Sequence, residues 1–347
     1  MKRASKSPPA TSKARPKILF GLSSTYLPGT VTGANVGLDA LCRRLIEAGY
    51  DPVVVCARDA AAAPPADAPA PPYPVLRLAD PVAALAEMIV HLAPQAVVMR
   101  GLNFAARAAK FRPVRDFPAC VKLVTSVAGQ GLPAPADVPH WRYAANSPFV
   151  VNQARAYLGV PVALVPSLVE PSAYYCKPSG EAVLFVNPVA DKGVHIAAAI
   201  ARRLRRRRFV FARSWPEHAD YPHQDVTLPN VEWAETVHDM RPLYARARLL
   251  LVPSVWEESS ARVVTEAQAS GIPVVASDRG GLADNVGRGG IVLSLAEPIG
   301  RWCAAVESLF TDAARHAALS RLARKHAHRP EIAPEEVLRR FLRFVAR

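Results

Sequence analysis

Through the first half of the chain, short apolar runs alternate with longer segments in which apolar residues recur at helical spacing. The apolar runs have the length of buried strands, and the segments between them have the length of ordinary helices. Strands are expected at residues 17–22, 53–57, 75–78, 96–99, 120–127, 144–147 and 162–166, and helices at residues 38–48, 81–92, 104–110 and 148–158. This alternation predicts a parallel sheet with helices on both of its faces.

The second half repeats the pattern and then ends in helices alone. Strands are expected at residues 182–186, 209–212, 231–235, 249–254, 273–277 and 289–293, and helices at residues 195–207, 240–247, 261–270, 297–310, 312–328 and 334–346. A chain of 347 residues is long enough for two domains of ordinary size. We therefore expect a disordered basic tail at 1–15, one α/β domain at 16–165, a second at 166–329, and a final helix at 330–347.

One stretch of the second domain, residues 258–281, carries the strongest chemical signal. An apolar strand leads into it, and Ser259 and Ser260 stand just before a periodic apolar run. A serine in that place is typical of a helix N-cap. Gly271 stands where a left-handed residue would end the helix.

Two carboxylates flank the start of this predicted helix. Glu258 precedes the helix, and Glu266 lies inside it. The first backbone amides of a helix have no helical partner, so they suit a phosphate group, and a carboxylate on either side suits hydroxyl groups. A ligand that carries both a diphosphate and several hydroxyls is a nucleotide sugar. For this spacing alone, a loop charge and a solvated helix residue are the commoner explanation.

The longer pattern around the two glutamates resembles the signature of a known enzyme family. Residues 266–277 read Glu-Ala-x-Ala-x-Gly-x-Pro-Val-Val-Ala-Ser, and Gly280 and Gly281 follow them. With the strand before Glu258, this combination resembles the Glu-x7-Glu signature of the family-4 glycosyltransferases (GT4), which are retaining enzymes of the GT-B fold. The resemblance covers residues 182–293 well and the first domain in outline.

The resemblance implies an architecture and a division of labour. The fold would be α/β of the GT-B type, with two Rossmann-like doubly wound domains facing a central cleft and C-terminal helices crossing back to the first domain. Residues 16–165 would form the acceptor domain, and residues 166–329 would bind the nucleotide-sugar donor.

The resemblance also implies roles for residues near the predicted helix. Glu266 would hold the ribose hydroxyls of the donor, and Glu258 would hold hydroxyls of the transferred sugar. The backbone amides of Ser260, Ala261 and Arg262 would bind the diphosphate. Many relatives have glycines in this segment, and their absence here limits how closely the backbone can approach the donor.

A second loop of the same domain carries the cation that the resemblance requires. Lys192 matches a lysine that binds the donor diphosphate in the family. Lys192 and Glu258 are the two residues expected to be catalytic. Asn187 stands where the family usually has an arginine, and its amide can donate a hydrogen bond but carries no charge. Arg213 is placed to compensate for that loss, with an ordinary surface arginine as the alternative.

The first domain contributes two weaker signals. The glycine-containing loop at 23–37 follows a strand, and in the family a glycine like Gly33 lies against the donor phosphates and the acceptor; a merely flexible turn explains the residues equally well. At the end of the strand 120–127 the family often carries a histidine, but this chain has none. Ser126 could offer a weaker hydrogen bond there, or it could be an ordinary serine at the end of a strand.

The formal net charge of +14 leaves three classes of anionic partner open: nucleic acid, an anionic membrane surface and an anionic substrate. No zinc-finger, RRM-type or helix-turn-helix motif appears, so nucleic acid is the weakest of the three. The arginine cluster at 202–208 is most simply a solvated face. The basic final helix, 334–346, is expected to pack across the first domain, with contact to anionic lipid as the alternative.

Three features bear on the cellular compartment. The five cysteines show no closely spaced pair, which is typical of reduced thiols in a cytoplasmic protein. The apolar runs are too short to span a membrane, and the first fifteen residues lack the apolar segment of a secretory signal.

The family resemblance implies a retaining, hexosyltransferase-type glycosyltransferase that uses a nucleotide diphospho-sugar and a glycan or lipid-linked acceptor, in cell-envelope or exopolysaccharide synthesis. We expect it in the cytoplasm, with a peripheral contact to the inner face of the membrane. No Asp-x-Asp occurs in the chain, so neither a metal nor another cofactor is expected. The rival interpretations are a catalytically weak GT-B scaffold that binds nucleotide or glycan, a protein that binds polyanions, and a nucleotide-sugar epimerase.

Overall fold

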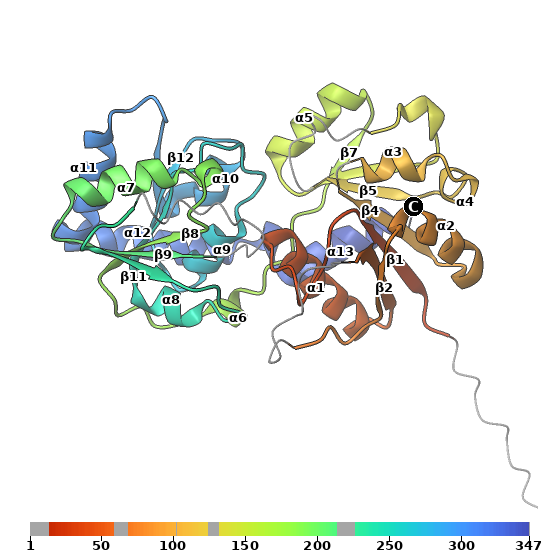
Figure 1. Ribbon diagram of the computed structural model, residues 1–347, viewed down its shortest axis with the longest axis horizontal. Coiled ribbons are helices and arrows are strands. Elements are labelled where there is room, and N and C mark those ends of the chain that lie inside the picture. Colours follow the sequence, from red (N-terminus) through yellow and green to blue (C-terminus); the bar gives the residue numbers. More distant parts are fainter. Residues whose placement is uncertain (1–13, 59–68, 102, 124–131, 214–225, 347) are drawn as a thin grey trace, which may run out of the picture.

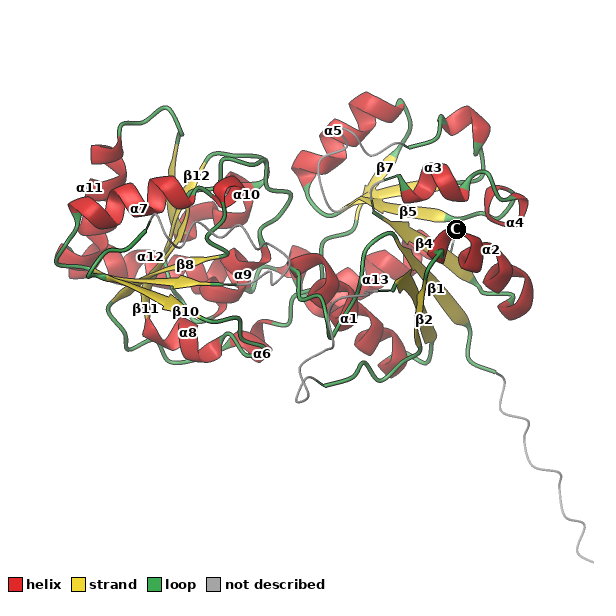
Figure 2. Ribbon diagram, viewed as in Figure 1, coloured by secondary structure: helices red, strands yellow, loops and turns green. Residues whose placement is uncertain are grey.

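The computed structural model describes residues 14–58, 69–101, 103–123, 132–213 and 226–346, and contains two parallel sheets side by side, each with its own helices (Figure 1). Helices cover both faces of each sheet (Figure 2). Adjacent strand residues point to opposite faces, yet Val54 and Val55 are both fully buried, as are Leu249, Leu250 and Leu251. Each sheet is therefore the middle layer of its own three-layer domain, as the alternating pattern predicts.

The first domain has a seven-stranded sheet in the order β3-β2-β1-β4-β5-β6-β7. Its strands are β1 (Lys17–Leu22), β2 (Asp51–Ala57), β3 (Val75–Leu78), β4 (Ala96–Arg100), β5 (Cys120–Leu123), β6 (Arg142–Ala145) and β7 (Val162–Leu164). Its helices are α1 (Gly33–Glu47), α2 (Pro81–Leu92), α3 (Phe104–Ala108), α4 (Arg112–Arg115) and α5 (Pro148–Leu158).

The second domain has a six-stranded sheet in the order β10-β9-β8-β11-β12-β13. Its strands are β8 (Ala182–Val186), β9 (Arg208–Ala212), β10 (Val231–Ala234), β11 (Ala247–Val252), β12 (Val274–Ser277) and β13 (Gly290–Leu293). The helices of this half are α6 (Pro171–Tyr174), α7 (Val194–Arg203), α8 (Arg241–Arg246), α9 (Arg262–Ala269), α10 (Leu282–Val286), α11 (Ile299–Thr311), α12 (Ala313–Ala327) and α13 (Pro334–Val345).

The strand order creates one crevice in each sheet. In the second sheet, β8 and β11 are neighbours although β9 and β10 lie between them in the sequence. In the first sheet, β1 and β4 are neighbours in the same way. At such points the connections leave in opposite directions, and ligands bind at the carboxyl ends of the two strands. The loops that follow β8 and β11 are the ones that carry the predicted Lys192 and Glu258.

The last helix, α13, packs on the first domain, as predicted. Phe341 is fully buried and its ring stacks on that of Phe20 in β1, with the ring centroids 6.0 Å apart. Val337, Phe344 and Val345 join the same apolar cluster. Figure 1 shows this blue helix among the red and brown elements of the first domain. Because its apolar face is used inside the protein, packing rather than lipid contact accounts for its amphipathic sequence.

Several boundaries differ from those expected. Helix α1 begins at Gly33, inside the predicted loop, because the Thr32 hydroxyl accepts a hydrogen bond from the Asn35 amide (3.2 Å) and caps the helix one turn early. Helix α7 ends at Arg203, and the Asn230 side chain donates to three carbonyl groups at that end. Residues 282–286, for which the sequence predicts neither a helix nor a strand, form helix α10.

Some expectations lie outside the described residues. The end of the strand predicted at 120–127, with Ser126, is one of them, and so is most of the basic tail at 1–15. Within the described ranges, no helix is both long and apolar enough to cross a bilayer.

Truncating the ring that anchors α13 should destabilise the protein strongly. We expect Phe341→Ala to lower the free energy of unfolding by about 3–5 kcal/mol, because it removes a buried aromatic ring from the core of the first domain. Urea denaturation followed by circular dichroism measures this change. Arg343→Ala on the exposed face of the same helix is the control and should change it by less than about 0.5 kcal/mol. Equal effects of both variants would show that α13 is not anchored by this ring.

Candidate functional site

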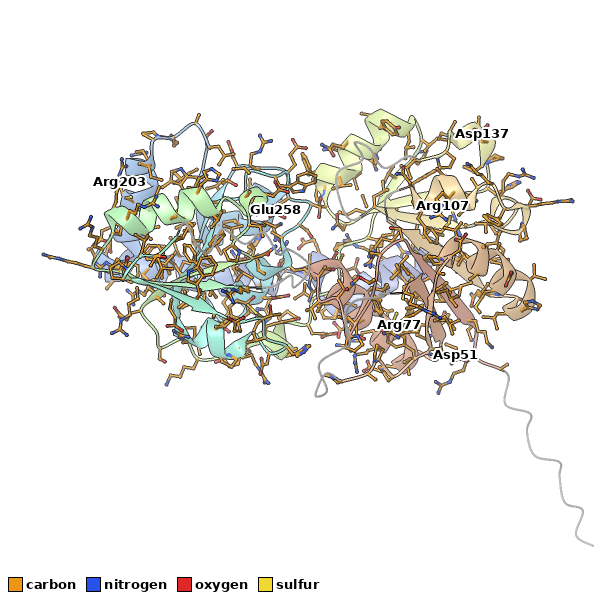
Figure 3. All side chains as sticks on the ribbon, viewed as in Figure 1. Asp51, Arg77, Arg107, Asp137, Arg203 and Glu258 are labelled. Carbon is orange, nitrogen blue, oxygen red and sulfur yellow. The ribbon has the colours of Figure 1, made fainter. Side chains whose placement is uncertain are left out.

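A cavity of about 330 Å³ opens between the two domains, at the carboxyl ends of the strands. Figure 3 shows Glu258 on the side of the second domain that faces the first. Of the predicted site residues, seven line the cavity: Gly33, Asn187, Lys192, Glu258, Ser260, Ala261 and Arg262. The structure thus brings together most of a set that was inferred from three separate segments of the chain.

An ion pair stands at the centre of the cavity wall. Lys192 Nζ lies 2.6 Å from Glu258 Oε1, and the Ser254 hydroxyl donates to the same oxygen at 2.7 Å. Glu258 is only 7% exposed. A carboxylate so far from bulk water is stable only with such partners, and their combined hold fixes its orientation toward the cavity.

The loop after β8 is fastened to the loop after β11. The Asp191 carbonyl accepts hydrogen bonds from the amides of Val255 and Trp256, each at 3.0 Å. Gly193 has a φ of +79°, and a side chain there would clash with the Pro253 carbonyl. The Lys-Gly pair therefore serves two needs: the lysine carries the charge, and the glycine lets its loop approach close enough to deliver it.

A glycine turn and an asparagine hold the Glu258 loop from the other side. The Gly281 amide donates to the Glu258 carbonyl (2.7 Å), and a side chain on Gly280 would clash with the Glu258 backbone. The Asn285 side-chain amide donates to the carbonyls of Ser260 and Ala261 (3.0 Å for the latter). The two glycines after β12 thus form a turn that packs against the segment carrying Glu258 and supports it.

The start of α9 differs from the expected serine cap. The N-cap position is Ala261, which has a φ of +37°, and no side chain caps the helix. The hydroxyls of Ser259 and Ser260 instead face Asn146 of the first domain, whose Nδ2 lies 3.1 and 3.3 Å from them. The serine N-cap prediction is therefore wrong, because the two hydroxyls are used across the cleft. The first amides of α9 are left without a side-chain acceptor, which suits an anionic ligand.

Glu266 is not at the cavity surface. It is 5% exposed and is absent from the described lining residues. The Tyr244 hydroxyl donates to its Oε2 at 2.8 Å, and Arg262 Nε lies 3.2 Å from its Oε1. Burial, reinforced by the Glu266 carboxylate, raises the pKa of Tyr244 well above its usual range, so this tyrosine stays a neutral donor. Both carboxylate oxygens are engaged within the protein, and the role of Glu266 in binding ribose stays a prediction.

Asn187 and Arg213 lie at the ends of neighbouring strands. Asn187 is buried, has a φ of +60° and lines the cavity. Arg213 forms an ion pair with Glu235 and lies over the Trp233 ring, 5.6 Å from its centroid. Arg213 is not among the described lining residues, so its role as the compensating cation stays a prediction.

Three lining or supporting residues were missed from the sequence. Asn146 is 5% exposed, lines the cavity, and its Oδ1 has no hydrogen-bond partner. Trp256 lines the cavity although 48% of it is exposed. Asn285 supports the Glu258 loop as described above. The only sequence signal was position: each lies in a segment that follows the carboxyl end of a strand.

The family model described as "Glycosyl transferases group 1" matches residues 180–312, which contain the ion pair and the whole Glu258 loop. This part of the chain is similar to the group 1 glycosyltransferases, which are of GT4 type. The resemblance inferred from the two glutamates is therefore confirmed.

Curated relatives match only a segment of the chain. The D-inositol 3-phosphate glycosyltransferase of Salinispora tropica is 40% identical over 97 residues, which are 27% of this chain and 19% of that protein. The enzyme of the same name from Corynebacterium kroppenstedtii is 39% identical over 93 residues, 26% of this chain and 20% of that protein. The match thus spans about a fifth of the length of these relatives.

Solved structures match nearly the whole chain. The match to a glycosyltransferase from Rickettsia africae covers 96% of this chain and 98% of that one, with 13% sequence identity and a TM-score of 0.76. The match to Anabaena Alr3699/HepE in complex with UDP-glucose covers 94% of this chain and 98% of that one, with 17% sequence identity and a TM-score of 0.76. At such low identity these likenesses show the fold, which is GT-B as predicted.

Crowding at the glycine turn should make one glycine far less replaceable than another. Gly280 and Gly159 both have a positive φ, +61° and +67°, but only Gly280 touches other backbone atoms closely. Gly159→Ala should lose about 1 kcal/mol of stability from backbone strain alone. Gly280→Ala should lose more, and it should speed hydrogen exchange of the amides at residues 257–262. Similar exchange rates in both variants would show that the turn does not hold the Glu258 loop.

Proposed function

We propose that this protein transfers a sugar from a nucleotide diphospho-sugar to a glycan or lipid-linked acceptor, with retention of anomeric configuration. The observation that carries the proposal is the Lys192–Glu258 pair, which faces an interdomain cavity beside the uncapped start of α9. This arrangement offers a cation and free amides to a diphosphate, and a fixed carboxylate to sugar hydroxyls. The Anabaena structure with a TM-score of 0.76 contains UDP-glucose, which supports a donor of this class.

The diphosphate would lie against positive potential from several sources. Lys192 supplies a full charge, and the amides of Ser260, Ala261 and Arg262 at the start of α9 supply hydrogen bonds. The first turn of α1, at Gly33, lines the same cavity from the other domain. Charge builds on the diphosphate as the bond to the sugar breaks, so these groups stabilise the transition state more than the ground state.

Glu258 is better suited to positioning than to nucleophilic attack. Its Oε1 already accepts hydrogen bonds from Lys192 and Ser254, and both contacts stabilise the negative charge that a nucleophile would have to share. In the proposed reaction, the bond between the anomeric carbon and the phosphate oxygen breaks, and the acceptor oxygen bonds to that carbon on the same face. The acceptor proton passes to the leaving phosphate oxygen, so no protein nucleophile is required.

The proposed reaction needs no metal ion. The charge that a metal would otherwise neutralise is met by Lys192 and the helix amides. We place the reaction in the cytoplasm, at the inner face of the membrane, in cell-envelope or exopolysaccharide synthesis, because acceptors of that kind are the usual ones for such folds.

One observation favours a second function. Glu266 is engaged by Arg262 and Tyr244, and Asn187 adds no charge to the cavity. A protein with these features could bind a nucleotide or glycan as a scaffold and turn it over slowly. Donor binding without measurable transfer or hydrolysis would favour this second function.

A panel of donors tests whether the cavity binds a nucleotide sugar. UDP-, GDP- and ADP-glucose are added without metal, and melting temperatures are recorded for the wild type and Glu266→Gln. One nucleotide should raise the melting temperature of the wild type by on the order of 5 °C at saturating concentration, because it binds only the folded state. The rise should be smaller in Glu266→Gln. If none of the three donors produces a shift in the wild type, the donor-site assignment fails.

Removing the central cation should slow the chemistry more than it weakens binding. We expect Lys192→Met to lower kcat for release of the nucleoside diphosphate roughly 100- to 1000-fold, since a charged donor to the leaving group is lost. The assay is run in EDTA, in which the wild type should retain full activity. Lys177→Met, at an exposed lysine of the same domain, is the matched control. A drop confined to KM would assign Lys192 to ground-state binding alone.

A further inference from the structure

Arg262 is a buried arginine for which the proposed reaction uses only the backbone amide. Its side chain, 8% exposed, is surrounded by polar partners: Nε faces Glu266 at 3.2 Å, Nη1 donates to the Leu168 carbonyl, and Nη2 donates to the Tyr174 hydroxyl at 3.1 Å. Burying a guanidinium is unfavourable unless its partners are fixed in this way.

The arginine occupies a carboxylate that a ribose would need. Glu266 Oε1 faces Arg262, and Oε2 accepts from Tyr244. Each carboxylate oxygen can accept about two hydrogen bonds, and Arg262 and Tyr244 already take one site on each oxygen. A ribose diol that binds to both oxygens therefore competes with Arg262 for Glu266.

The same side chain lies on the seam between the two domains. A Cβ added at Gly33 would lie 3.3 Å from Arg262 Cδ, and one at Gly37 would lie 3.2 Å from Nη1, so the side chain runs along the first turn of α1. Leu168 belongs to the segment that joins the two domains. Arg262 thus contacts the second domain, the first domain and their connection at once.

Arg262 also has room to move. It lines the 330 Å³ cavity that contains Lys192 and Glu258, and it lines a second interdomain cavity of about 350 Å³. Lys192 and Arg262 are the two cations among the described residues that line the first cavity. A released guanidinium is therefore next to the place proposed for the diphosphate.

We propose that Arg262 is a switch that exchanges Glu266 for the donor diphosphate. In the empty site the guanidinium holds Glu266 and closes the ribose position. When a nucleoside diphosphate enters, the guanidinium moves from Glu266 to the phosphates. Glu266 can then accept hydrogen bonds from the ribose hydroxyls, so the protein binds both ends of the ligand. No covalent bond changes in this exchange. The inference rests on the proposed function, and it assigns to Arg262 the compensating charge that sequence analysis assigned to Arg213.

The exchange predicts opposite effects on two ligands. A nucleoside without phosphates must displace Arg262 from Glu266 and offers the guanidinium nothing in return. A nucleoside diphosphate replaces the lost partner with a better one. Removing the guanidinium should therefore help the first ligand and harm the second, whereas a purely structural arginine would affect both in the same direction.

The test compares UDP and uridine on three proteins: the wild type, Arg262→Leu and Arg246→Ala. Calorimetry measures UDP, and displacement of UDP measures uridine. In Arg262→Leu, UDP should bind about 10- to 100-fold more weakly, as for loss of a hydrogen-bonded charge, and uridine should bind severalfold more tightly. Arg246, which pairs with Glu232 away from the cavity lining, is the matched control and should leave both affinities unchanged.

A milder variant covers the case in which Arg262→Leu does not fold. Tyr174→Phe removes one partner of the guanidinium and leaves the charge in place. It should ease release of Glu266, so uridine should bind roughly two- to threefold more tightly while UDP is not weakened. If the wild type binds UDP, and the variants weaken uridine and UDP alike, the switch is overturned while the proposed function stands. If the wild type binds none of UDP, GDP and ADP, the proposed function fails and the switch fails with it.

Discussion

The ion pair between Lys192 and Glu258 is the interaction on which the cleft depends. The two residues are 66 positions apart, and they meet because β8 and β11 are neighbours with opposite connections. Backbone contacts around the pair hold it in place. The Asp191 carbonyl joins the two loops, and the glycine turn at 280–281 contacts the backbone of Glu258. The pair is buried enough that breaking it would leave a charge without compensation, so the loops cannot relax independently.

Across the cleft, polar side chains of the two domains contact each other. Asn146 reaches Ser259 and Ser260, Gln153 reaches Glu257 at 3.2 Å, and Arg262 lies along the first turn of α1. Polar contacts of this kind are exchangeable for ligand or water at little free energy, unlike the packing inside each domain. The seam is therefore the part of the molecule in which a ligand can most easily alter the structure.

Sequence reasoning succeeded where the determinants are local. Helices at 81–92 and 148–158 were expected with the bounds that the structure has, because a proline starts each one and periodicity fixes the rest. It also found the loops that carry Glu258 and Lys192. It failed at the N-cap of α9, because the serine hydroxyls face Asn146 through a contact that only the folded chain creates. For the same reason it did not foresee the contact of Glu266 with Arg262, while the role of Glu266 toward the donor stays a prediction. The sequence shows that Arg262 lies four positions before Glu266, on the same helix face. It does not show that the two side chains are buried together.

The crossing of α13 has a consequence for how the protein is made. Phe341, Phe344 and Val345 complete the core of the first domain, yet they follow the whole second domain in the sequence. During synthesis the first domain emerges early and must wait, with one face of its sheet incompletely covered, until residues 337–345 have left the ribosome. The second domain has its strands and most of its helices in one continuous stretch and can close its core before then. The usual order, in which the N-terminal domain folds first, is thus reversed for the final packing step.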